Sequence, residues 1–160
     1  MLNQNDYVEL LAPFDPTRIG KQPLAANTKH QWSTIGFDFI SAPQHRFTYT
    51  LSSRTGGYYA NGKLFSLTAN IGYRIQPYVN IDISSTYNHI DLPQPWGKNN
   101  FLLVGPKVDI TMTNTLFFTT FFQYNEQTTN INFNTRFQWR YKPASDLFIV
   151  YTDNYYIGPV

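Results

Sequence analysis

The residues of this sequence with the clearest chemical potential are charged side chains, which recur within segments of alternating polar and apolar residues. On neighbouring antiparallel strands, opposite charges stabilise a sheet by about 0.2–1 kcal/mol per pair. Charged side chains can also line a polar pore and select the solutes that cross it. The sequence leaves both interpretations open: a charge ladder that ties strands together, and a solute path. The candidate residues are Arg74, Asp82, Lys107, Asp109, Arg136, Arg140 and Asp153.

These side chains are expected to form one row with interleaved signs across several strands. Antiparallel pairing across short turns brings each charged residue close to a residue of the next strand. Asp82 is expected near Gly72 and diagonal to Arg74, and across the next connection it comes near Lys107 and Asp109. The row is then expected to continue through Asp109, Thr119, Arg136 and Asp153, each facing the next.

Catalysis and metal binding find little support in the sequence. Two carboxyl groups for glycoside hydrolysis must lie roughly 5–9.5 Å apart, and one must hold its proton. Each acid of the row has a basic neighbour, which lowers a carboxyl pKa and disfavours that role. The nucleophile elbow, the phosphate loop and the His-Glu-x-x-His motif are absent. His30, His45 and His89 are dispersed, whereas metal ligands must converge, so we expect no catalytic residue, metal or cofactor.

Three aromatic residues in expected loops form a second candidate site. Tyr58, Tyr59 and Trp96 could stack on sugar rings, and ordinary loop packing is the other interpretation. A binding site usually adds convergent polar groups to its aromatic walls. The sequence places none beside these three, which favours loop packing.

The elements that must position these residues are β-strands, and the stretch from Ile131 to Lys142 shows this most clearly. Successive side chains of a strand point to opposite faces. The odd positions are therefore expected on an apolar face and the even positions, with three cations, on a polar face. A membrane-spanning barrel strand has this pattern, and so does a half-buried strand of a soluble sandwich. The odd set is Ile131, Phe133, Thr135, Phe137, Trp139 and Tyr141, and the even set is Asn132, Asn134, Arg136, Gln138, Arg140 and Lys142.

Eight further segments are expected to form strands, which predicts an all-β antiparallel meander of about eight or nine long strands. Two long stretches rich in turn residues, Ala12–Asn27 and Thr55–Lys63, are expected to be loops. Leu116–Asn125 is apolar on both sides, and we place Gln123 and Asn125 on its polar face. The expected strands are Tyr7–Leu11, Lys29–Ser41, Arg46–Arg54, Leu64–Ile75, Val79–Ile90, Asn100–Met112, Leu116–Asn125 and Leu147–Asn154.

The expected connections alternate between short and long, which is typical of outer-membrane barrels with short periplasmic turns and longer outer loops. A soluble sandwich has no reason to gather its short turns at one end. Aromatic residues are expected near both ends of the strands, as in the interfacial belts of a barrel. One belt comprises Tyr73, Tyr78, Phe118, Tyr141 and Phe148 at the short-turn end, and the other Phe65, Tyr87, Phe101 and Tyr124.

Length and composition are consistent with one domain, residues 1–160, which we expect to be a single β-barrel region. Aromatic residues make up 18% and charged residues only 14%. The net charge of +2 is too small, and the basic residues too scattered, to indicate nucleic acid as a partner. The first residues, MLNQNDYVELL, lack the basic start and apolar core of a signal peptide. Because a barrel must be exported, we expect the chain to be a C-terminal fragment of a longer protein.

Three segments resemble a known family: Tyr87–Trp96, Phe121–Asn125 and above all Asn134–Asn154. Together they are similar to the C-terminal β-barrel, called domain of unknown function 5916, of Gram-negative outer-membrane proteins whose N-terminal domain resembles carbohydrate-binding family 9. The specific positions are Asn134, Arg136, Trp139, Pro143, Ser145, Asp146, Leu147 and Tyr151. The resemblance implies that an N-terminal domain and a closing strand lie outside this sequence. The resemblance implies an outer-membrane location, membrane lipid as a partner and a loose link to carbohydrate binding or uptake. The family also carries a hydrolase label that no residue here supports.

The sequence as a whole predicts an outer-membrane barrel segment with a structural or solute-passage role. The first alternative is a soluble β-sandwich that binds carbohydrate through Tyr58, Tyr59 and Trp96. A membrane-associated hydrolase is the third interpretation.

Overall fold

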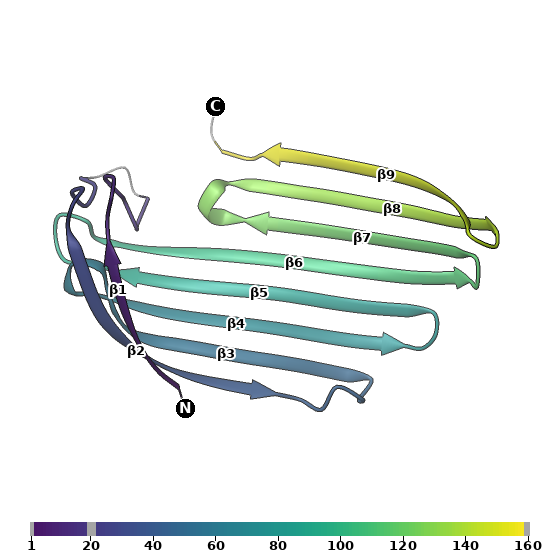
Figure 1. Cartoon of the computed structure of the whole chain (residues 1–160), viewed down its shortest axis with the longest axis horizontal. Coiled ribbons are helices and arrows are strands. Elements are labelled where there is room, and N and C mark those ends of the chain that lie inside the picture. The colour runs from purple at the N-terminus through teal and green to yellow at the C-terminus, as the bar shows by residue number, and fades with distance from the viewer. Residues whose placement is uncertain (1, 19–21, 159–160) are drawn as a thin grey trace. The chain divides into compact units, whose positions relative to one another are not determined.

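The computed structural model describes residues 2–18 and 22–158, which form nine antiparallel strands (Figure 1). The strands follow one another in a single sheet in the order β1 to β9, which confirms the predicted all-β meander. Two connections contain short 3-10 turns, η1 (Tyr59–Asn61) and η2 (Glu126–Thr128). The strands are β1 (Leu2–Glu9), β2 (Lys29–Ile40), β3 (Phe47–Tyr58), β4 (Gly62–Ile75), β5 (Val79–Asp91), β6 (Lys98–Thr113), β7 (Leu116–Asn125), β8 (Asn130–Lys142) and β9 (Ser145–Tyr156).

The register of β6 to β9 divides their side chains between two faces. Phe118 pairs with Phe137 and Phe122 with Phe133, so the apolar sets of β7 and β8 share one face. Thr119 pairs with Arg136, which places the polar sets on the other face. We call these the apolar face and the polar face. Gln123 lies on the polar face, as predicted.

The predicted loop Thr55–Lys63 is mostly strand, because its glycines serve close packing rather than a turn. An added Cβ at Gly57 would come within 2.7 Å of the Trp32 Cβ, and one at Gly56 would collide with the Ser33 carbonyl oxygen. Glycine inside a strand often marks such a close approach of another backbone. The remaining connection, Tyr59–Asn61, is as long as the opposite turn at 76–78. The predicted alternation of short and long connections is therefore wrong at this position.

The chain divides into two compact units, and only the first has a buried apolar core among the described residues. That unit comprises Met1–Phe39, Leu51–Thr68 and Thr86–Phe101. Its buried apolar side chains are Leu10, Leu24, Ile90, Leu92 and Phe101. The burial of Phe101 contradicts its prediction as a residue of an exposed aromatic belt.

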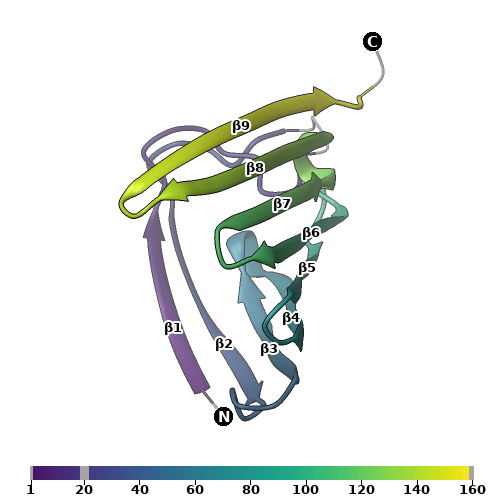
Figure 2. The ribbon, with the colours of Figure 1, turned by 90° about the vertical axis from the view of Figure 1, so that its right-hand side faces the viewer.

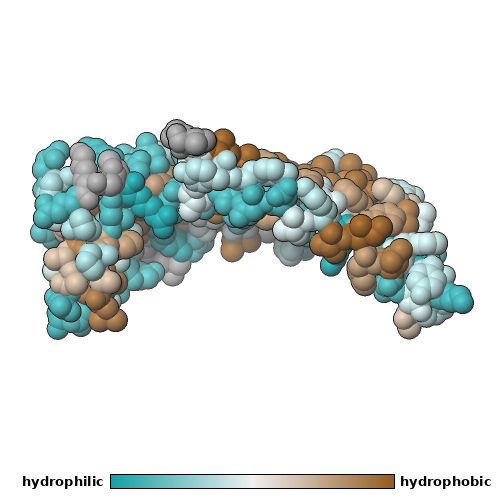
Figure 3. All heavy atoms as spheres, turned by 90° about the horizontal axis from the view of Figure 1, so that it is seen from above, coloured by the Kyte–Doolittle hydropathy of each residue, from teal (hydrophilic) through white to brown (hydrophobic). Residues whose placement is uncertain are grey.

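The second unit, comprising Ile40–Thr50, Ala69–Ser85 and Leu102–Val160, instead exposes large apolar side chains at alternate strand positions. Along β4, Ile71, Tyr73 and Ile75 are all more than 40% exposed. On β8, Trp139 is 45% and Tyr141 54% exposed. Figure 2 shows β7, β8 and β9 as successive neighbours, and among the described residues no helix longer than a 3-10 turn is present to cover them. Hydrophobic atoms reach the surface along β9 in Figure 3.

No helix formed by the described residues has the length and apolar character needed to cross a membrane.

Candidate functional site

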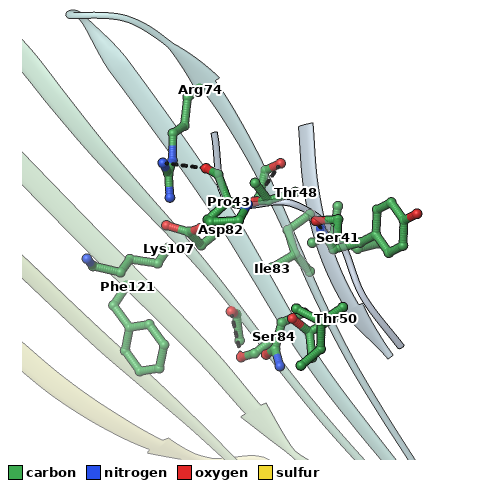
Figure 4. A pocket seen from close by; sticks show the side chains of 16 residues that line it. Ser41, Pro43, Thr48, Thr50, Arg74, Asp82, Ile83, Ser84, Lys107 and Phe121 are labelled. Carbon is green, nitrogen blue, oxygen red and sulfur yellow. Dashed lines mark hydrogen bonds between the residues drawn. The ribbon is translucent and has the colours of Figure 1, made fainter. Parts of the chain in front are cut away.

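A hollow of about 430 Å³ gathers three of the predicted charged residues in the second unit. Its walls include Arg74 of β4, Asp82 of β5 and Lys107 of β6, with hydroxyl groups of Thr48 and Ser84 beside them (Figure 4). Alternate positions of each strand reach the same face, which is why a period of two in the sequence predicts this grouping. Arg74, Asp82 and Lys107 therefore line the same hollow, and their role as a charge ladder stays a prediction.

Two glycines keep the hollow open by carrying no side chain. A Cβ on Gly72 would come 2.9 Å from Asp82 Oδ1, in line with the predicted proximity of the two residues. A Cβ on Gly105 would come 2.9 Å from Ser84 Oγ and 3.3 Å from the ring of Phe121. These separations are shorter than ordinary van der Waals contacts, so any larger residue would displace the wall.

The carboxylates of this region are held by donors on neighbouring positions. Lys107 Nζ lies 2.7 Å from Asp109 Oδ2, and Thr119 Oγ1 donates to Asp109 Oδ1 at 2.8 Å. Asp82 accepts a hydrogen bond from the side-chain amide of Asn80. Arg74 donates to the carbonyl oxygen of Pro43 at 3.4 Å. The arrangement is a polar lining with compensated charges, apart from Arg74 and Asp82, which form no ion pair among the described residues.

Asp153 does not belong to this row. The β8–β9 register pairs Arg136 with Val150, and Asp153 lies opposite Phe133 on the apolar face. There the Tyr151 hydroxyl donates to Asp153 Oδ2 at 2.7 Å. The predicted pairing of Arg136 with Asp153 is wrong, because that prediction started β9 at Leu147 and did not count the irregularity between Arg140 and Lys142. By the same register Phe148 lies on the polar face, not in an apolar-face belt.

The acid that the prediction missed is Asp146. It is the second residue of β9 and lies opposite Arg140, whose Nε donates to its Oδ1 at 3.1 Å. Because Pro143–Asp146 was predicted to be a turn, this acid was not among the predicted strand residues. The signal was available: an Arg and an Asp flanking a Pro-Ala turn suit the two ends of a hairpin.

The aromatic residues Tyr58, Tyr59 and Trp96 do come together, but they face each other and the core of the first unit. All three pack against the buried cluster of Ile90, Leu92 and Phe101. The Tyr59 ring lies 4.8 Å from that of Tyr58, 4.7 Å from Trp32 and 5.5 Å from Phe14, between ring centroids. Partial burial raises the pKa of the Tyr59 hydroxyl above its usual value. This is the loop packing that the sequence analysis favoured, and sugar binding here stays a prediction.

A docked connection between β1 and β2 was not predicted. Thr17 is fully buried, its Oγ1 donates to Asp15 Oδ1 at 2.8 Å, and its carbonyl oxygen accepts from Asn99 Nδ2 at 2.6 Å. The sequence predicted only that Ala12–Asn27 is a loop. A Thr two residues after an Asp is a known local turn signal, but nothing local points to Asn99.

Among the described residues no three His, Asp or Glu side chains form a group that could hold a metal ion. The arrangement offers a polar face with paired and unpaired charges, suited to contact with polar solutes. Comparisons with models of protein families, with curated proteins and with solved structures found no match.

Proposed function

We propose that this chain is a segment of an outer-membrane β-barrel, with its apolar face against lipid and its polar face lining a water-filled interior. The observation that carries the proposal is the exposed apolar surface of the second unit. Soluble monomers rarely expose contiguous apolar patches larger than a few hundred Å². Here Tyr73, Ile75, Tyr141, Ile149 and Tyr151 are each between 46% and 59% exposed.

The charge distribution supports the same orientation. Lys107, Asp109, Arg136 and Arg140 all lie on the polar face of β6 to β8. Charges on a lipid-facing surface cost roughly 2–4 kcal/mol each near the bilayer centre, whereas an interior-facing surface tolerates them. Asp153 is the exception in β8 and β9, and it lies close to the end of β9.

Strand length supports the proposal as well. Barrel strands need roughly 9–11 residues to cross the hydrocarbon core. Strands β2 to β9 have between 10 and 16 residues. A soluble β-sandwich, the alternative, needs two packed sheets, whereas the described strands form one.

The role that fits this geometry is architectural or the passage of polar solutes along the polar face. The similarity of Asn134–Asn154 to the domain-of-unknown-function 5916 barrels adds a link to carbohydrate uptake. That family assignment and the link to sugar are part of the proposal.

Brominated lipids test the proposal, because bromine quenches tryptophan fluorescence only on contact within the acyl region. The full chain is refolded into vesicles as two single-tryptophan variants. Trp32→Phe/Trp96→Phe keeps Trp139 on the apolar face, and Trp96→Phe/Trp139→Phe keeps Trp32, which packs against Tyr58 and Tyr59. We expect strong quenching of Trp139 and weak quenching of Trp32. Equal quenching of the two, or a chain that stays in solution without entering vesicles, would overturn the proposal.

A further inference from the structure

The polar face of β7, β8 and β9 carries a surplus of positive charge. Arg136 and Arg140 lie on this face of β8, and Lys142 follows at the hairpin end, beyond the irregular pairing. The register places a single acid, Asp146, on the same face among the described residues of the three strands. Arg136 forms no ion pair there, since its cross-strand neighbours are Thr119 and Val150.

Apolar side chains flank the basic row on the same face. Gln138 lies between Arg136 and Arg140 along β8, and its neighbours across the sheet are Phe117 on one side and Phe148 on the other. Phe148 is 50% and Val150 58% exposed. The guanidinium carbon of Arg140 lies 6.0 Å from the centre of the Phe117 ring. Aromatic rings interact only weakly with water. Their exposure on a polar face therefore indicates a ligand with an apolar part.

The spacing suits a ligand with one charged group. A strand rises about 3.3 Å per residue, so each arginine starts roughly 7 Å from Gln138, one on either side. Arginine side chains are long enough to converge over that position, and the planar guanidinium group binds carboxylate through two parallel hydrogen bonds. At the hairpin end, a hollow of about 580 Å³ is lined by Arg140, Lys142 and Asp146 and leaves room beside the row.

We propose that Arg136 and Arg140, with Phe117 and Phe148 at their sides, bind a small organic anion, a carboxylate that carries an aromatic or other apolar body. The cations hold the carboxylate above Gln138, and the two rings contact the apolar body. Lys142 adds long-range attraction from the hairpin end. This inference goes beyond the proposed function and does not rest on it, because binding can be measured on the folded chain in a nonionic detergent.

The test is a fluorine NMR titration of the full chain with three probes: 4-fluorophenylacetate, its neutral amide, and inorganic phosphate as a competitor. We expect the carboxylate to bind, the amide not to bind, and phosphate to compete only weakly. Arg136→Gln/Arg140→Gln should weaken binding about tenfold or more, since both charged hydrogen-bond donors are lost. The matched control Lys29→Gln/Lys63→Gln removes the same charge at exposed positions of β2 and β4 and should leave binding unchanged.

The double variant loses the Arg140–Asp146 ion pair and could fail to fold for that reason. The single variant Arg136→Gln keeps this ion pair and is therefore tested as well. Because Arg136 forms no ion pair among the described residues, this variant should fold and still bind several-fold more weakly. Phe148→Ser should weaken binding of the fluorinated carboxylate and leave that of phosphate unchanged. Equal binding of the amide, phosphate as tight as the carboxylate, an equal loss in the lysine control, or no binding at all would overturn the inference.

Discussion

Arg136 on β8 lies opposite Val150 on β9, three residues away from the acid that the sequence suggested as its partner. The pairing leaves this arginine without a counter-ion on either neighbouring strand among the described residues, because its other neighbour is Thr119. A cation kept in this way must be solvated by water or by a ligand. Arg136 lies on the polar face of this part of the sheet, and the opposite face carries the apolar side chains.

Gly105→Val should destabilise the wall of the polar hollow. A Cβ at this position would come 2.9 Å from Ser84 Oγ and 3.3 Å from the Phe121 ring, so the free energy of unfolding should fall by roughly 1–3 kcal/mol. The measurement is urea unfolding of the chain in detergent. Adding Phe121→Ala should restore part of the loss, because the ring is then absent. Unchanged stability in the single variant would contradict this packing.

Thr17→Val should loosen the connection between β1 and β2. The substitution keeps the side-chain volume and removes the hydroxyl donor to Asp15, at a cost of about 1 kcal/mol. Limited proteolysis should then cut faster within residues 10–28. Gln22→Ala, at an exposed position of the same connection, is the control and should not change the rate. Equal rates for all three proteins would show that Thr17 does not hold this segment.

Alkaline pH should weaken the aromatic cluster around Tyr59. Burial raises the pKa of this phenol, so the folded protein holds the proton more tightly than the unfolded chain does. Its stabilising contribution is complete below the ordinary tyrosine pKa of about 10 and is lost as pH rises through the higher folded value. Unfolding followed between pH 8 and 12 should show this decline, and Tyr59→Phe should reduce it. A decline of the same size in the variant would assign the effect to other groups.

The alternation of polar and apolar residues along the sequence was sufficient to predict most of the fold. Phe133 and Phe137 were placed on one face and Arg136 on the other, and the assignment of Gln123 to the polar face of β7 was right. The reason is that side chains alternate in direction along a strand. The residue types at every second position therefore show which face of the sheet is apolar and which is polar.

The register between β8 and β9 could not be predicted from the sequence. The hairpin between β8 and β9 contains Ala144 with a positive φ of 60° and an irregular pairing between Arg140 and Lys142. Since side chains alternate, a slip of one residue transfers every side chain to the other face. The predicted pairing of Arg136 was three residues off, an odd number, which is why Asp153 was assigned to the wrong face.

Contacts between distant segments were also beyond the sequence. Thr17 accepts a hydrogen bond from Asn99, which lies 82 residues away along the chain. Nothing in the local pattern of either segment specifies this pair. The same holds for Phe101, whose alternating strand pattern gave no indication that it packs into the core of the first unit.

The central claim is that the apolar face of β8 contacts lipid while its polar face contacts water, and cysteine scanning tests this most directly. The chain contains no cysteine, so each introduced thiol is a unique reporter. Single variants Phe133→Cys, Asn134→Cys, Arg136→Cys and Phe137→Cys are refolded into vesicles and treated with a charged, water-soluble maleimide. The account predicts rapid labelling at positions 134 and 136, and labelling at 133 and 137 only after detergent removes the lipid. Rapid labelling at 133 and 137 in intact vesicles, or protection at 134 and 136, would contradict it.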